Sequence, residues 1–166
     1  MSKVLPILVI IAIVAFIGIA KPGFSFAGQA PDFSLYDAKG RVVTLSEQRG
    51  KVIVLDFWAS WCPPCRAAMP AMDRLYNTYK DRGVIVYGIN INDTADPIQF
   101  MYKMGVNYPL LVNGEPAAEI YRVEGIPTLV VIGVDGNILY RDSGWSPQLE
   151  DKIATIIEKE LNKNNM

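Results

Sequence analysis

The hydrophobic and polar positions in the first half of the chain predict a hairpin, two central strands and a helix. Residues 33–36 and 42–45 alternate around a polar turn, which is typical of a β-hairpin. Residues 51–58 and 84–91 are almost continuously apolar, a pattern that indicates strands buried on both faces. Apolar residues recur at helical spacing between these runs, which predicts an amphipathic helix over residues 63–80.

The second half of the chain continues the alternation and then changes it. The patterns predict a short helix at 96–104, a strand at 109–112, a helix at 116–122, a strand at 128–134, its hairpin partner at 137–141 and a last helix from 146 to about 161. Strands and helices alternate first, and the chain ends in a hairpin and a helix. This order predicts the α/β class, with a mixed sheet and helices on both of its faces.

The N-terminal segment has a different composition from the rest. An uncharged, mostly apolar run from Val4 to Ala20 follows Lys3. Its length lies between that of a signal-peptide core and that of a comfortable membrane-spanning helix, and residues 25–27 resemble a cleavage site. We therefore predict a signal peptide or membrane anchor at 1–27, with cleavage and retention both open, and one domain at 28–166. Either outcome places the domain outside the cytoplasm, in the periplasm or at the outer face of a bacterial inner membrane.

Composition excludes several classes of function. The formal charge is −1 and no cluster of Lys and Arg is present, so nucleic acid is not an expected partner. The chain has no histidine, which removes every histidine-dependent mechanism and every histidine metal ligand. It has only two cysteines, so a four-cysteine zinc site within one chain is excluded, and we expect no metal site.

The two cysteines lie in the sequence Cys62-Pro63-Pro64-Cys65, between a buried strand and the first turn of a helix. The free N–H groups and the dipole of a helix N-terminus favour the thiolate, which is the nucleophile in disulfide exchange. Two intervening residues place both sulfurs within bonding reach. The motif in this context predicts a redox-active disulfide between Cys62 and Cys65 and no organic cofactor.

Two segments carry a resemblance to a known family. Residues 56–65, DFWASWCPPC, resemble the active-site segment of the thioredoxin superfamily, and residues 125–128, GIPT, resemble its second signature, a cis proline that faces the disulfide. The resemblance covers about residues 29–161. The leading hairpin, the insertion at 107–122 and the N-terminal segment are similar to the TlpA/ResA-like thiol–disulfide reductases of bacterial envelopes, several of which serve cytochrome c maturation. The resemblance implies a thioredoxin-like fold with an N-terminal β-hairpin and a central αβ insertion.

The sequence departs from this branch beside the cysteines. The branch often carries a glutamate three residues after the second cysteine, where this chain has Ala68. Thioredoxins instead carry a buried aspartate six residues before the first cysteine, which corresponds to Asp56 here. In thioredoxins a lysine on the neighbouring strand approaches that aspartate, and the matching position here is Gly88. We therefore expect a buried Asp56 without a cationic partner.

The resemblance and the residues together imply a reductase of protein disulfides. Cys62 attacks the substrate disulfide, Cys65 resolves the mixed disulfide, and Asp56 accepts the proton of Cys65. The electron donor implied is a membrane thiol reductant. The residues expected to contact the substrate are Trp61, Pro63, Pro64, Ile126 and Pro127.

Three alternative functions are also compatible with the sequence. The same cysteine chemistry could serve an oxidant or isomerase. The leading hairpin also occurs in peroxiredoxins, although these need Thr or Ser three residues before the reactive cysteine, where this chain has Ala59. Two cysteines could also carry Cu(I), although no histidine completes the usual ligand set.

Overall fold

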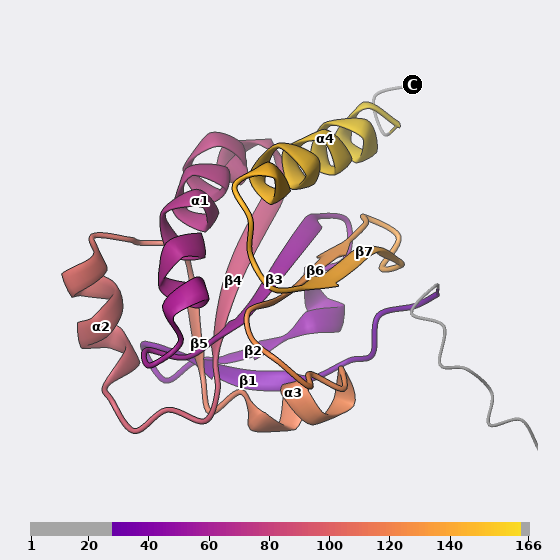
Figure 1. Ribbon diagram of the computed structural model, residues 1–166. Coiled ribbons are helices and arrows are strands. Elements are labelled where there is room, and N and C mark those ends of the chain that lie inside the picture. The colour runs from indigo at the N-terminus through magenta and orange to yellow at the C-terminus, as the bar shows by residue number, and fades with distance from the viewer. Residues whose placement is uncertain (1–27, 164–166) are drawn as a thin grey trace, which may run out of the picture.

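A computed structural model describes residues 28–163, and within them a seven-stranded sheet separates two layers of helices (Figure 1). The strands are β1 (Ser34–Asp37), β2 (Val42–Thr44), β3 (Val52–Trp58), β4 (Val84–Asn90), β5 (Leu110–Val112), β6 (Thr128–Ile132) and β7 (Ile138–Ser143). The helices are α1 (Pro63–Tyr79), α2 (Pro97–Met104), α3 (Glu115–Ile120) and α4 (Gln148–Lys163), with short 3-10 turns at Leu45–Gln48 and Lys80–Arg82. The predicted α/β class and all the predicted elements are confirmed, with boundaries that differ by a few residues.

The sheet is mixed, with the strand order β2-β1-β5-β4-β3-β6-β7. The central strands β3, β4 and β5 run parallel, and β6 and β1 pair antiparallel to the outer two of them. The predicted hairpin of β1 and β2 forms one edge, and the insertion contributes β5 and α3. This is the thioredoxin-like fold with an N-terminal β-hairpin that the sequence predicts.

Strand β3 explains how the sheet organises the core. All seven of its residues are buried, and its side chains alternate between the two faces. Val54 and Trp58 pack with α1, α2 and α4 on one face, whereas Leu55 and Phe57 pack with α3 on the other. Asp56 shares the face of Val54 and Trp58, so its carboxyl group lies beneath α1.

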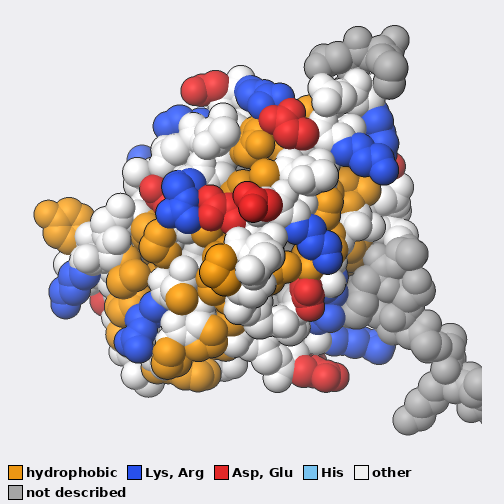
Figure 2. All heavy atoms as spheres, turned by 45° about the horizontal axis from the view of Figure 1, so that its top comes forward, with side chains coloured by type: hydrophobic (Ala, Val, Ile, Leu, Met, Phe, Trp, Pro, Cys, Tyr) orange, Lys and Arg blue, Asp and Glu red, His pale blue; other side chains and the backbone are white. Residues whose placement is uncertain are grey.

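Helices α1 and α4 cover the same face of the sheet and are joined at their surface. Arg74 of α1 pairs with Glu150 of α4 at 2.6 Å, and Arg82 pairs with Glu158 at 2.7 Å. Figure 2 shows basic and acidic side chains interspersed over this face, with no extended area of one sign.

The predicted signal peptide or membrane anchor at 1–27 lies outside the described residues. Within residues 28–163, no helix is long and apolar enough to cross a membrane.

Candidate active site

A disulfide joins Cys62 and Cys65 where β3 gives way to α1, with the two Cα atoms 5.3 Å apart. The position of Cys62 nearer the helix end predicts that it is the more exposed of the two cysteines. In the oxidised structure its exposed fraction is only 2%, against 0% for Cys65. Cys62 is thus the more exposed cysteine, but its exposed fraction is small. The reason is that Cys62 belongs to the hydrophobic cluster beneath α1 and lies close to the 125–128 loop.

The Cys62 sulfur is the N-cap of α1 and accepts one backbone hydrogen bond, from the Cys65 N–H at 3.2 Å. The two residues between them, Pro63 and Pro64, carry no backbone N–H. Both prolines are exposed at the start of the helix. A helix end that normally offers several N–H donors therefore offers this sulfur one.

The 125–128 loop lies against Cys62, as its predicted role requires. The Ile126–Pro127 peptide bond is cis, which confirms the sequence prediction. The carbonyl oxygen of Ile126 lies 3.6 Å from the Cys62 Sγ. Thr128 fixes the loop by donating from Oγ1 to the Gly125 carbonyl oxygen at 2.6 Å. Ile126 is half-buried and Pro127 is buried beside the disulfide loop.

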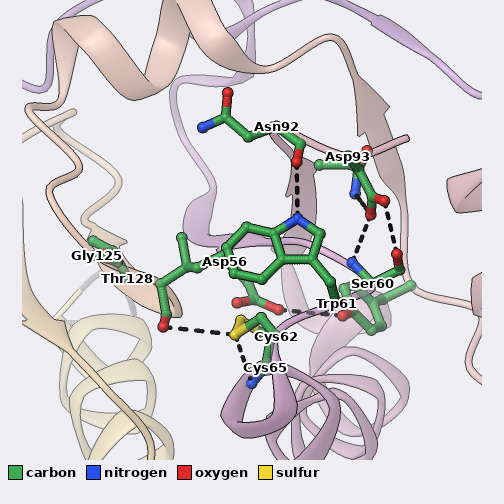
Figure 3. Close-up of a disulfide and its surroundings, with 12 residues drawn as sticks. Asp56, Ser60, Trp61, Cys62, Cys65, Asn92, Asp93, Gly125 and Thr128 are labelled. Carbon is green, nitrogen blue, oxygen red and sulfur yellow. Dashed lines mark hydrogen bonds between the residues drawn. A yellow bond between two sulfur atoms is a disulfide. The ribbon is translucent and has the colours of Figure 1, made fainter. Parts of the chain in front are cut away.

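Trp61 forms the exposed border of the site, with 58% of its surface accessible. Its Nε1 donates to the carbonyl oxygen of Asn92 at 2.8 Å, which fixes the indole group next to Cys62 (Figure 3). Trp58, in contrast, is completely buried and packs against Phe100. The two tryptophans of the motif therefore lie in opposite environments, Trp58 in the core and Trp61 at the surface.

Asp93 secures the segment before the cysteines. Its carboxylate accepts hydrogen bonds from the Ser60 hydroxyl at 2.7 Å and from Asn90 Nδ2 at 3.0 Å (Figure 3). Burial alone would raise the pKa of Asp93, but hydrogen bonds from Ser60, Asn90 and Ala95 outweigh it and lower that pKa. Asp93 therefore stays ionised and ties the loop after β4 to the loop that carries Trp61.

Asp56 is the buried acid of the site, with an exposed fraction of 0%. It pairs in register with Gly88 of β4, as the sequence suggested, so no side chain reaches it from that position. Burial raises the pKa of Asp56 from 3.8 to about 7, although a hydrogen bond from the Tyr108 hydroxyl to Oδ2, at 3.2 Å, opposes the rise. A carboxyl group of this kind changes its protonation state near neutral pH, as a proton acceptor must.

The structure brings Asp56, both cysteines and the cis-proline loop together at the start of α1 (Figure 3). Sequence reasoning missed Tyr108, Asn92 and Asp93. The pair of Tyr108 and Asp56 is separated by 52 positions, and no motif links them. In the described part of the chain, no cluster of three or more His, Cys, Asp or Glu side chains could hold a metal ion.

Comparisons with known proteins agree with this geometry. A sequence model of the AhpC/TSA family matches residues 27–141. The thiol-disulfide oxidoreductase ResA of Halalkalibacterium halodurans is 32% identical over 135 residues, which cover 80% of this chain and 77% of that protein.

Solved structures give the same result. A Chlorobium tepidum structure, described as a thiol:disulfide interchange protein DsbE, has a TM-score of 0.75 and 33% identity, and covers 81% of this chain and 96% of its own. An exposed lipoprotein thioredoxin of Streptococcus pneumoniae has a TM-score of 0.63 and 27% identity, and covers 78% of this chain and 99% of its own. The chain therefore belongs to the AhpC/TSA family, and its cysteine pair makes it a thiol–disulfide oxidoreductase of the ResA and DsbE type.

Proposed function

We propose that this oxidoreductase works as a reductase of protein disulfides outside the cytoplasm. The Cys62 thiolate attacks one sulfur of the substrate disulfide, and the other substrate sulfur leaves as a thiolate that takes up a proton. The Cys65 thiol loses its proton and attacks the Cys62 sulfur of the mixed disulfide. The substrate leaves as a dithiol, two electrons have moved to it, and the Cys62–Cys65 disulfide seen in the structure is the product.

We infer the direction of the reaction, reduction of the substrate, from the single backbone hydrogen bond to the Cys62 sulfur. Strong disulfide oxidants owe their character to a stabilised reduced form, in which the thiolate is held by nearby donors and charge. Here Pro63 and Pro64 remove two of the helix-end donors, and the Cys65 N–H remains. Weaker stabilisation of the thiolate favours the disulfide and makes the dithiol a better electron donor.

Asp56 is the proton acceptor for Cys65 in this proposal. It faces the layer that contains Cys65, is buried beneath α1, and titrates at about 7. At that pKa it is partly ionised at neutral pH and can take the thiol proton without a large free-energy cost. Ala68 leaves no second carboxylate at the position where the similar envelope branch often carries glutamate.

The surface around the disulfide suits an extended protein segment. Trp61 offers an exposed aromatic face, the two prolines of the motif are exposed, and the Ile126 carbonyl group borders the sulfur. We propose that Trp61, Pro63, Pro64, Ile126 and Pro127 contact the substrate. No organic cofactor takes part, because the dithiol itself supplies the electrons.

The apolar run at residues 4–20 supports a location on the outer side of the cytoplasmic membrane. The similar pneumococcal protein is described as an exposed lipoprotein, which agrees with such a location. A dithiol outside the cytoplasm needs a supply of electrons, so we propose a membrane thiol reductant as the donor. The resemblance to the envelope branch makes apocytochrome c the first class of protein substrate to test.

The direction can be tested by running both half-reactions with one preparation. The dithiol form should reduce insulin faster than the disulfide form oxidises a reduced, unfolded protein, and the double variant with both cysteines changed to serine should do neither. Faster oxidation than reduction would contradict the proposed direction while leaving the oxidoreductase chemistry intact. Labelling of Cys62 by a membrane-impermeant thiol reagent in intact, reduced cells tests the location, and labelling only after lysis would contradict it.

A further inference from the structure

The carboxyl group of Asp56 has one hydrogen-bond partner among the residues that the structure describes. The Tyr108 hydroxyl donates to Oδ2 at 3.2 Å, and Oδ1 is buried without a hydrogen-bond partner among residues 28–163. Tyr108 lies just before β5 and is itself 2% exposed. The carboxyl group is therefore held through one oxygen while the other stays available.

Gly88 makes room for this contact. A Cβ atom at position 88 would lie 2.7 Å from Tyr108 Cε2 and 2.9 Å from Trp58 Nε1. Both distances are below any ordinary van der Waals contact, so a side chain at this position would displace the tyrosine ring. The absence of a side chain on β4 beside Asp56 is thus what allows Tyr108 to reach the carboxyl group.

The segment with Tyr108 is anchored to the helix that carries the cysteines. The Asn107 N–H donates to Asp73 Oδ1 of α1 at 2.7 Å, and the Gly88 N–H donates to the Pro109 carbonyl oxygen at 2.8 Å. These two bonds fix the residues on either side of Tyr108. Its hydroxyl group is therefore held in a defined place relative to both α1 and β4.

We propose that Tyr108 is a positioning residue for the redox reaction, which orients Asp56 through one oxygen, leaves the other for the Cys65 proton, and sets the pH at which Asp56 accepts it. This inference rests on the proposed role of Asp56 as proton acceptor. A neutral hydroxyl donor stabilises the carboxylate less than a cation would. The acceptor consequently works near neutral pH instead of being fully ionised far below it.

The groups that face Asp56 support this assignment. Tyr108 is the titratable side chain that hydrogen-bonds to Asp56, while β4 and β6 place Gly88 and Leu129 opposite it. The two cysteines at the start of α1 are joined in a disulfide and do not titrate in this form. Burial, and then the charge of Asp56, keep the pKa of Tyr108 well above its usual range, and Asp73 adds to this. Tyr108 therefore remains a hydrogen-bond donor throughout the pH range in which Asp56 titrates.

The test is the variant Tyr108→Phe, which keeps the ring and removes the hydroxyl group. Loss of one hydrogen bond to the carboxylate should move the Asp56 titration, followed by carboxyl carbon NMR of the oxidised protein, upward by about 0.5–1 pH unit. The low-pH limb of the pH–rate profile for disulfide reduction should also move to higher pH. Gly88→Ala, which displaces the ring but keeps the hydroxyl, should also raise both midpoints.

Tyr121→Phe is the matched control. Tyr121 is another buried tyrosine, and its hydroxyl donates to the Pro31 carbonyl oxygen at 2.9 Å on the opposite face of the sheet. Its loss should leave both midpoints unchanged. Circular dichroism and thermal unfolding of all three variants establish that they are folded.

The outcomes separate the two proposals. An unchanged Asp56 titration in folded Tyr108→Phe would overturn the role of Tyr108, even if the enzyme reduces disulfides and Asp56→Asn abolishes the low-pH limb. A shifted titration in a protein that reduces no disulfide would instead support the role of Tyr108 in setting the protonation of Asp56 and contradict the proposed function.

Discussion

The two sides of the disulfide differ in burial and in the kind of residue that forms them. The outer side consists of an exposed tryptophan, two exposed prolines and a backbone carbonyl group. The inner side consists of Asp56 and Tyr108, both buried, around a glycine. The residues proposed to contact the substrate and those proposed to control the proton therefore lie on different sides of the disulfide, so substitutions on the two sides should change different measurable quantities.

The largest effect should come from the cysteines, where the two sides meet. Cys65→Ser removes the resolving thiol, so the variant should lose turnover completely and accumulate mixed disulfides with its substrates through Cys62. Cys62→Ser should lose turnover without trapping, because Cys65 is completely buried. Non-reducing gel electrophoresis and mass spectrometry after incubation with a disulfide substrate measure the trapped species. Equal trapping by both variants would contradict the assignment of Cys62 as the nucleophile.

On the inner side, Asp56→Asn should stabilise the protein at high pH. Because burial raises the pKa of Asp56 from 3.8 to about 7, the folded protein binds the proton more tightly than the unfolded chain. This tighter proton binding adds stability that is complete below the pKa of Asp56 in the unfolded chain. That added stability is lost as the pH rises through the folded-state pKa of about 7. Asparagine stays neutral, so the free energy of unfolding of the variant should exceed that of the wild type by a margin that grows by roughly 2–4 kcal/mol between about pH 4 and about pH 8.

Urea unfolding of both oxidised proteins at the two pH values measures this margin. Changes that come from other titrating groups cancel in the difference between the proteins. A margin that stays constant with pH would show that Asp56 titrates at an ordinary pKa. Asp56 would then not be the proton acceptor proposed for the buried side of the disulfide.

On the outer side, Trp61→Ala should weaken the substrate complex and leave stability almost unchanged. Truncation of a tryptophan that contacts a bound protein commonly costs more than 1 kcal/mol, so KM for a protein disulfide should rise about 5–10-fold. The reduction potential and the rate with a small disulfide should stay the same. Tyr102→Ala removes a still more exposed aromatic residue from α2, at 81% exposure, and serves as the control. An equal KM change in both variants would remove Trp61 from the substrate surface.

The smallest effect should come from the motif prolines. Pro64→Ala restores an N–H at the second position of α1, within the turn capped by the Cys62 sulfur. One further hydrogen bond to the thiolate corresponds to a rise in reduction potential of about 10–30 mV. Pro70→Ala adds an N–H inside the same helix, away from the sulfur, and should leave the potential unchanged. A fall in potential in Pro64→Ala would indicate that loop geometry outweighs the added donor.

Most of the fold could be predicted from the sequence because its patterns are local. The apolar run of β3 predicts that the strand is buried, and the apolar periodicity of α1 predicts which face of the helix is buried. The sequence CPPC followed by a helix indicates the redox site. The cis bond before Pro127 was accessible through the resemblance to the thioredoxin superfamily. The outer side of the disulfide lies almost entirely in these two contiguous segments, and this explains why it could be predicted.

The inner side could not be predicted in the same way. Its key contact joins Asp56 of β3 to Tyr108, just before β5, across the intervening strand β4, and it depends on an absent side chain at Gly88. The sequence identified Gly88 as the position of a missing lysine but could not show which residue takes the vacated space. The small exposure of Cys62 was also missed, because it depends on the 125–128 loop, which lies more than sixty positions away.

The reduction potential of the Cys62–Cys65 pair decides most directly whether the protein is a reductase or an oxidant. Equilibration of the protein with dithiothreitol or glutathione buffers, followed by quantification of the dithiol and disulfide forms, gives this value. With a single N–H donor at the sulfur, we predict a potential closer to that of thioredoxin, about −270 mV, than to that of a strong oxidant at about −120 mV. A potential above roughly −170 mV would be more oxidising than protein disulfide isomerase and would make this protein an oxidant.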